Sequence, residues 1–184
     1  MKIEKIKLKD AALIHLEKTQ DERGFFARAW CRREMEQFNL EVDVLQCNLS
    51  YNHKKGTIRG MHFQNEPHAE VKFVRCIKGA VYDVIIDLRK TSPTYLQWIG
   101  VELSHDNRDM LYVPAGFAHG YQTLTDNTEL FYQVSAYYTP DAENGIRWND
   151  PFFKIQWPEM NAIIVSDKDQ QWADFRKEHS DDHC

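Results

Sequence analysis

The sequence predicts an all-β fold, a jelly roll of two antiparallel sheets with a few short helices. Short segments rich in Val, Ile, Phe, Tyr and Trp recur along the chain, and turn signals such as Lys-Gly, Ser-Pro and Pro-Ala-Gly separate them. No long helical pattern lies between these segments, which disfavours a parallel, doubly wound sheet. Two antiparallel sheets that close on each other are therefore expected, and the mouth of such a barrel can hold a ligand.

The individual elements follow from the residue pattern in chain order. A charged segment at 32–37 is the expected early helix, because Met35 and Phe38 are spaced to face one way and Asn39 ends the pattern. A strand-like segment at 56–64 carries two glycines. The remaining expected strands are 42–45, 73–77, 80–88, 95–103, 110–113 and 130–138.

Length and composition predict one globular domain over residues 1–184. The chain has 184 residues, of which 42% are hydrophobic and 28% charged, and a domain usually has roughly 150 residues. No repeat or low-complexity linker divides the sequence. The polar end, about residues 175–184, is expected to be a mobile tail, which is the simplest interpretation of His179 and His183 there.

Charge and hydropathy argue against nucleic acid and membranes as partners. The 23 basic and 28 acidic residues give a net charge of -5 without a long cationic block. No apolar stretch is long enough for a bilayer, and the first residues lack the apolar core of a signal peptide. Four scattered cysteines, with no Cys-x-x-Cys pair, fit free thiols and hence a cytoplasmic location.

His62 is the most suggestive candidate for chemistry. It lies in the segment Gly-Thr-Ile-Arg-Gly-Met-His-Phe-Gln, which places Arg59 nearby and in which Gly56 and Gly60 permit close backbone approach. A single histidine is more often a core or surface residue bonded to the backbone. The surrounding residues favour a functional role here.

A second histidine, His119, follows the segment Val-Pro-Ala-Gly-Phe-Ala. The pattern Pro-x-Gly-x-x-His resembles the second motif of the cupin superfamily, a jelly-roll fold in which this histidine often binds a metal. The first cupin motif usually supplies His-x-His, whereas this chain has His62-Phe-Gln64, and an amide is a poor metal ligand. A metal site formed by His62, His119 and a carboxylate such as Glu70 is the second interpretation.

Two further features suit an anionic ligand. Arg23, whose planar guanidinium can hold a phosphate, precedes Phe26, which offers a stacking face, although a solvated turn with two core aromatics is equally plausible. Lys72 alternates with apolar residues in Glu-Val-Lys-Phe-Val-Arg. On the inner face of a barrel it needs an anionic partner, because an unpaired buried ammonium is costly. Alternation alone does not decide between an inner and an outer position.

Eight short motifs occur in one order along nearly the whole chain. They are Asp21-Glu-Arg-Gly-Phe-Phe, Gln46-Cys-Asn-Leu-Ser, Arg59-Gly-Met-His-Phe-Gln, Asp83-Val-Ile-Ile-Asp-Leu-Arg, Ser92-Pro-Thr, Pro114-Ala-Gly-Phe-Ala-His-Gly, Trp148-Asn-Asp-Pro and Ser166-Asp-Lys-Asp. Together they closely resemble the dTDP-4-dehydrorhamnose 3,5-epimerase family. The resemblance implies a cupin-like jelly roll (a double-stranded β-helix), usually a homodimer, that acts without metal or redox cofactor on a nucleotide-linked 4-keto-6-deoxyhexose.

The implied reaction is epimerisation at C3, at C5 or at both, in deoxysugar biosynthesis of the dTDP-rhamnose type. A ketone at C4 acidifies the protons on both carbons, so the site needs a base, an oxyanion stabiliser and an acid. The resemblance implies that His62 is the base and that Asp169 orients its ring. It implies that Lys72 stabilises the enolate and that Tyr132 donates a proton on the opposite face.

The resemblance also implies a set of substrate-binding residues. Arg59 and His119 would donate hydrogen bonds to the sugar or the diphosphate. Arg23 would bind phosphate beside Phe26, and Tyr138 would stack on the base. The further polar residues implied around the nucleotide are Gln46, Asn48, Glu143 and Lys168.

Two positions depart from the family pattern. Members that bind thymidine nucleotides commonly have Glu two residues after Phe26, where this chain has Arg28. A carboxylate accepts the thymine N3 hydrogen, whereas a guanidinium only donates, so the nucleotide base stays open. Cys47 replaces the usual Asp and either tunes substrate choice or fills space. A third interpretation is a sugar-nucleotide binding protein without catalysis.

Overall fold

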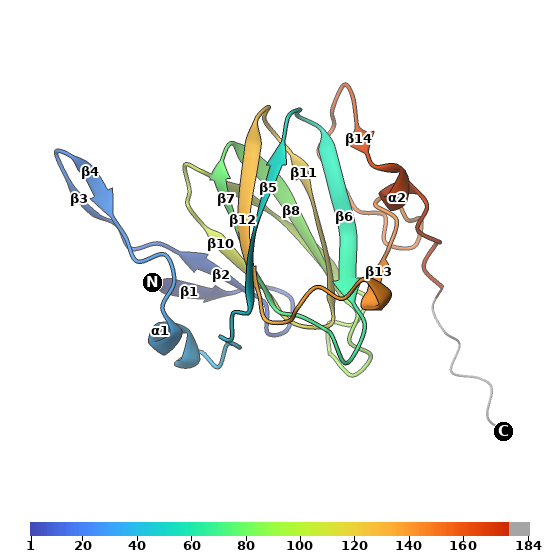
Figure 1. The fold of residues 1–184 in the computed structure, drawn as a ribbon, viewed down its shortest axis with the longest axis horizontal. Helices are drawn as coiled ribbons and strands as arrows, with labels where there is room; N and C mark the ends of the chain where they lie inside the picture. Colours follow the sequence, from blue (N-terminus) through green and yellow to red (C-terminus); the bar gives the residue numbers. More distant parts are fainter. Residues whose placement is uncertain (177–184) are drawn as a thin grey trace.

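The computed structural model describes residues 1–176, and within them two six-stranded sheets face each other (Figure 1). In sheet order, the first sheet contains β1 (Lys2–Lys5), β2 (Ala12–His15), β10 (Met110–Val113), β7 (Lys72–Lys78), β12 (Thr128–Val134) and β5 (Gln46–Asn52). The second contains β13 (Glu143–Gly145), β6 (Thr57–Gln64), β11 (Phe117–Thr123), β8 (Ala80–Asp87) and β9 (Trp98–Ser104), with β14 (Ile164–Val165) pairing with β6. The expected all-β jelly roll is confirmed.

The remaining elements are small. A two-stranded hairpin, β3 (Thr19–Asp21) and β4 (Gly24–Phe26), projects from the sheets in Figure 1. The helices are α1 (Arg32–Glu36), one 3-10 turn (Pro140–Ala142) and α2 (Asp167–Gln170). None of the helices in the described 176 residues has the length and apolar character needed to cross a bilayer.

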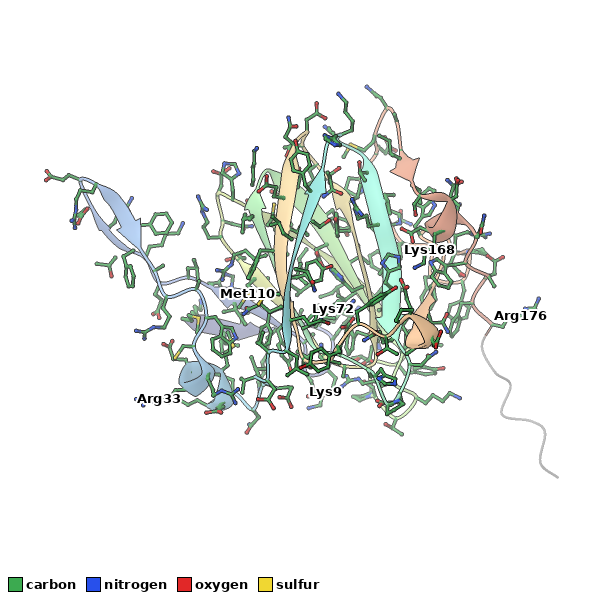
Figure 2. The ribbon with its side chains drawn as sticks, viewed as in Figure 1. Lys9, Arg33, Lys72, Met110, Lys168 and Arg176 are labelled. Atoms are coloured by element: carbon green, nitrogen blue, oxygen red, sulfur yellow. The ribbon has the colours of Figure 1, made fainter. Side chains whose placement is uncertain are left out.

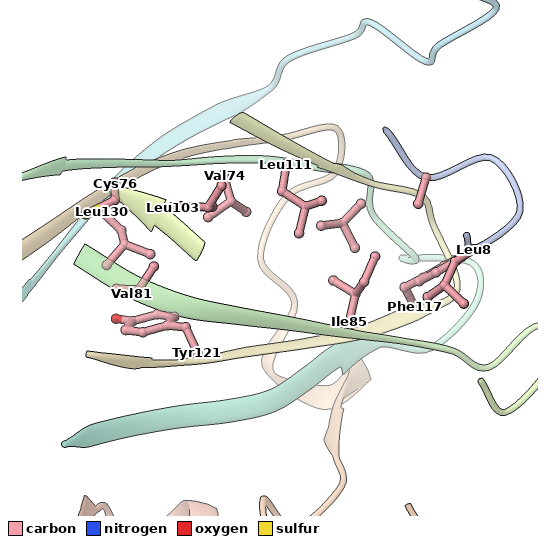
Figure 3. Packing of buried hydrophobic residues seen from close by; sticks show 12 residues of the cluster. Leu8, Val74, Cys76, Val81, Ile85, Leu103, Leu111, Phe117, Tyr121 and Leu130 are labelled. Atoms are coloured by element: carbon pink, nitrogen blue, oxygen red, sulfur yellow. The ribbon is translucent and has the colours of Figure 1, made fainter. Parts of the chain in front are cut away.

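The core lies between the two sheets. Strand alternation points Val74 and Cys76 of β7 inward, opposite Val81 and Ile85 of β8 (Figure 3). Lys72 shares the parity of Val74 and Cys76, so it also faces the interior, where it is nearly buried. One end of this interior is apolar, and the other end carries the polar side chains described below.

The expected early helix is confirmed, with one correction. Met35 is fully buried on α1, and Asn39 has a positive φ of 57° just after the helix ends. Phe38, however, lies beyond the helix and is 43% exposed, because the helix ends at Glu36. The outer face of the first sheet is therefore covered by Met35 and not by Phe38.

The predicted strand 42–45 is wrong. The Glu41 carboxylate accepts hydrogen bonds from the Val42 and Asp43 amides, each at 3.0 Å, so these amides are not available to a sheet. The strand predicted at 95–103 begins too early, because Leu96 has a positive φ of 62° and β9 begins only at Trp98. The strand predicted at 130–138 ends at Val134 in the structure.

The polar tail was expected from about residue 175, but Phe175 belongs to the packed structure. Its amide donates a 2.6 Å hydrogen bond to Asp150, and its ring packs against Phe152 and Phe153. The rest of the expected tail, residues 177–184, lies outside the described residues.

Candidate active site

A pocket of about 340 Å³ opens at the polar end of the interior. Half of the predicted site residues line it, and they come from strands of both sheets and from the segment that follows β12. They are Gln46, Asn48, His62, Lys72, Tyr132, Tyr138 and Glu143. A larger hollow of about 560 Å³ beside β1 contains none of the predicted residues, so volume alone does not locate the site.

His62 is paired with Asp169, as the sequence led us to expect. His62 Nε2 lies 2.6 Å from Asp169 Oδ1, and the Gly60 amide donates to the other carboxylate oxygen at 3.2 Å. The Asp169 side chain is 5% exposed and that of His62 is 32% exposed. Burial by itself would raise the pKa of Asp169, but its interactions with His62 and Gly60 lower it below its usual value. A charged carboxylate therefore fixes the imidazole.

Local sequence explains how Asp169 reaches a strand so distant in the chain. Ser166 caps α2 by accepting a hydrogen bond from the Asp169 amide at 3.2 Å. Just after the helix, the Trp172 indole lies so close to Gly145 that a Cβ there would overlap the ring. Gly145 pairs with His62 in the sheet, so the indole packs on the strand that borders His62.

A second histidine and carboxylate pair lies beside the first. His119 Nε2 is 2.9 and 3.0 Å from the two oxygens of Asp83, which is fully buried. His119 is also the register partner of His62 across β11 and β6. No role was predicted for Asp83 from the sequence. Its sequence position could have indicated one, because Asp83 is a charged residue on the inner face of an apolar strand, between Val81 and Ile85.

Lys72 has the anionic partner that an inward lysine requires. Its Nζ lies 3.1 Å from Glu70 Oε1, and both side chains are nearly buried. Figure 2 shows Lys72 between the two sheets. The two possible positions for Lys72 are thus resolved in favour of the inner face. Glu70 belongs to the pocket but was considered from sequence only as a metal ligand.

Tyr132 lies on the inner face of β12, in the sheet opposite β6 and His62. Burial raises the pKa of its phenol, the Glu70 carboxylate raises it further, and Arg59 offsets part of the rise. The phenol is therefore held in its neutral form, which is the form that can donate a proton.

Arg59 is held at the edge of the site by a polar network. Its Nε donates to Asn52 Oδ1 at 2.8 Å, and the Asn52 amide donates to the Tyr121 hydroxyl at 3.2 Å. Ser50 Oγ is 2.8 Å from the same hydroxyl. Together with the Tyr51 carbonyl, which accepts from Arg59 Nη2 at 3.3 Å, this network fixes the orientation of the guanidinium.

Three charged or polar side chains meet at the rim of the pocket. Glu143 Oε2 accepts hydrogen bonds from the Tyr138 hydroxyl and from Lys168 Nζ, each at 2.6 Å. Burial opposes ionisation of Glu143, but Lys168 and Tyr138 lower its pKa below the usual value. The Tyr138 amide in turn donates to Gln46 Oε1 at 2.7 Å. These four predicted residues therefore form one connected rim, to which α2 contributes Lys168 (Figure 2).

None of the other predicted binding residues lines the pocket of this chain, and three of them belong to the hairpin or to the residues just after it. Arg23, on the projecting hairpin, pairs with Asp21 and is 85% exposed, and Phe26 is 73% exposed (Figure 1). Arg28 pairs with Glu34 at 3.1 Å. All three predicted residues lie on the hairpin or just after it.

Cys47 is exposed on β5. Its neighbours Gln46 and Asn48 line the pocket, so alternation places Cys47 on the opposite, outer face of the sheet. Within one chain, Cys47 therefore does not line the pocket and is open to solvent.

The residues considered for a metal site have other partners. His62 and His119 each pair with their own aspartate, and Glu70 pairs with Lys72. Across residues 1–176, no three histidine, cysteine or carboxylate side chains are grouped so that they could hold a metal ion.

Comparisons with known proteins agree with these features. Residues 5–177 match the family model described as dTDP-4-dehydrorhamnose 3,5-epimerase. A protein of that name from Sinorhizobium fredii is 40% identical over 169 residues, covering 92% of this chain and 87% of its own. The crystal structure of the Bacillus anthracis enzyme of that name, with TDP and pyrophosphate bound, has a TM-score of 0.91 at 42% identity and covers 95% of this chain and 99% of its own.

A more distant structure shows how the family can vary. A 3'-monoepimerase from Streptomyces bikiniensis, in complex with dTDP-quinovose, has a TM-score of 0.86 at 28% identity. It covers 93% of this chain and 86% of its own. The same fold is therefore found in an enzyme described as acting at one carbon.

Proposed function

Because the chain belongs to the dTDP-4-dehydrorhamnose 3,5-epimerase family, a family of isomerases in deoxysugar biosynthesis, we propose that it epimerises a nucleotide-linked 4-keto-6-deoxyhexose without metal or redox cofactor. One observation carries the proposal: a histidine and carboxylate pair lies across a pocket from a half-buried tyrosine, with a lysine between the sheets. The residues are His62, Asp169, Tyr132 and Lys72.

The proton balance of the proposed reaction uses these groups in turn. His62 Nε2 faces Asp169, so Nδ1 is the nitrogen that takes the proton from the carbon next to the ketone. The C–H electron pair forms the enolate C=C bond, and the carbonyl π pair moves to O4. The Lys72 ammonium stabilises the charge on O4. Tyr132 then donates its proton to the opposite face of that carbon, and solvent restores both groups.

The direct test is proton NMR of the protein with freshly made dTDP-4-keto-6-deoxyglucose in deuterated water. We expect the C3 or C5 signal, or both, to disappear as deuterium enters, because each enolate formed exposes its carbon to solvent-derived protons. Loss at both carbons identifies a 3,5-epimerase, and loss at one identifies a monoepimerase. Absence of exchange with thymidine, uridine, guanosine, cytidine and adenosine diphosphate sugars alike would refute the proposal.

We further propose that the protein is a homodimer in which the hairpin completes the partner's pocket. Arg23 and Phe26 are the predicted phosphate and stacking residues, yet they project into solvent from a single chain. The outer face of the edge strand β5 is apolar and open, with Leu49 63% and Tyr51 38% exposed. Such a face is typical of a surface that another copy covers.

The dimer predicts complementation between two defective variants. Arg23→Ala and His62→Ala subunits, unfolded and refolded together, are expected to regain activity, because each mixed dimer has one pocket with neither substitution. Mixed dimers are about half of the total and have one intact site each, so recovery approaches roughly a quarter of the native rate. Sedimentation as a monomer, or no recovery on mixing, would contradict the dimer.

We also infer a reducing, cytoplasmic setting. Cys31, Cys47 and Cys76 are free thiols in the described part of the chain, which fits proteins of reducing compartments.

A further inference from the structure

Glu70 is the charged residue of the pocket that the proposed reaction does not use. It precedes β7 and faces the same way as Lys72, whose Nζ is 3.1 Å from Glu70 Oε1. The Gln64 amide donates to Glu70 Oε2 at 3.4 Å. Gln64 is itself held by the carbonyl of Tyr137 and the amide of Thr139. The carboxylate is therefore held from two sides.

The ion pair between Glu70 and Lys72 fixes the position of the lysine ammonium. Lysine is a point charge on a flexible four-carbon chain, so its ammonium has no fixed place unless a partner holds it. Here both side chains are nearly buried, where an ammonium without a partner would be costly. Glu70 thus fixes the donor that must meet the developing charge on O4, because preorganised groups stabilise a transition state best.

The same carboxylate acts on Tyr132. Its negative charge disfavours a second negative charge on the phenolate, and it raises the pKa of the phenol in addition to burial, while Arg59 opposes it. The charged or titratable groups around Tyr132 come from four strands, β6, β7, β11 and β13, and from the residue that lies two positions before β7. They are Glu70, Lys72, Arg59, His62, Tyr121 and Glu143.

We propose that Glu70 is a positioning residue of this site, which holds the Lys72 ammonium at the substrate ketone and keeps Tyr132 in its neutral, proton-donating form. The inference rests on the proposed epimerase function for its catalytic consequence. Glu70 and Tyr132 line the same pocket, so the effect of the carboxylate on the phenol does not depend on the substrate.

The first test is a titration that needs no substrate. Protein labelled at tyrosine Cζ is titrated by carbon NMR, and the Tyr132 signal is identified by its loss in Tyr132→Phe. In Glu70→Gln, which keeps the size and an acceptor oxygen, we expect the Tyr132 midpoint to move to lower pH. An unchanged midpoint would overturn the proposal, whether or not the protein is an epimerase.

The second test measures turnover. Glu70→Gln is expected to lower kcat about tenfold with little change in KM, because it weakens transition-state stabilisation more than binding. Its rate should also begin to fall at lower alkaline pH than in the native protein, because the donor must be protonated. A native kcat and a native pH profile in Glu70→Gln would refute the inference while leaving the proposed function intact.

Two matched variants separate charge from position. Glu70→Asp keeps the charge but shortens the side chain, so it should retain most of the native Tyr132 midpoint while lowering kcat. Glu102→Gln makes the same chemical change on an exposed position of β9 and should leave both quantities unchanged. If Glu70→Asp and Glu70→Gln shift the midpoint equally, the charge of Glu70 is not what acts on Tyr132, and the proposal fails.

Discussion

Replacing His62 by alanine is expected to abolish deuterium incorporation at the sugar, with a loss of about 10³-fold or more. The reason is positional: His62 is the imidazole held by Asp169 at 2.6 Å in the pocket, and alanine leaves no group there to take the carbon-bound proton. Loss of proton NMR signal at C3 and C5 in deuterated water measures the effect directly. Exchange and epimerisation should fall together, because both need the enolate.

The matched control is His105→Ala. His105 is 48% exposed on its side chain and lies outside the pocket, so its removal should leave the exchange rate at the native value. Thermal unfolding of both variants shows whether either substitution disturbs the fold. If a folded His62→Ala protein exchanged at an undiminished rate, His62 would not be the base.

The strands that the sequence predicts well are the buried ones. Residues 110–113 were expected and observed with identical bounds, and 73–77 and 80–88 differ from β7 and β8 by one residue at the ends. Burial on at least one face gives these segments their apolar pattern. By contrast, β3 is exposed throughout and β1 nearly so, and their composition therefore carries no comparable signal.

The residues of the site also differ in how well the sequence alone reveals them. His62 and Lys72 stand out in the sequence because each is a charged or titratable residue within an apolar strand. Asp169 is 107 residues away from His62, so only the fold joins them, and its assignment came from the family resemblance. Asp83 and the pairing role of Glu70 were missed, because a carboxylate reveals its partner only in three dimensions.

Replacing Asp169 by asparagine is expected to lower kcat by about 10²–10⁴-fold while the protein stays folded. The Asp169 carboxylate accepts from the His62 Nε2 hydrogen, which leaves Nδ1 free to act as base. An asparagine amide can donate to Nε2 instead, so the proton moves to Nδ1 and the base is lost. Asparagine also lacks the charge that stabilises the imidazolium formed when His62 takes the proton.

The same substitution changes how stability depends on pH. The pKa of Asp169 is lower in the folded protein than its usual value, so its ionised form stabilises the fold above the unfolded pKa of about 4. That stabilisation is lost as pH falls through the folded pKa. The native protein should therefore melt at a higher temperature than Asp169→Asn at neutral pH, and the difference should narrow in acid.

Asp167→Asn provides the control on the same helix. Asp167 is exposed in the first turn of α2, two residues from Asp169, so both kcat and the acid dependence of melting should match the native protein. Because Asp169 has one oxygen on His62 and the other on the Gly60 amide, its removal affects catalysis and stability together. A folded Asp169→Asn protein with native kcat would show that His62 needs no charged partner, and the pairing would then be structural only.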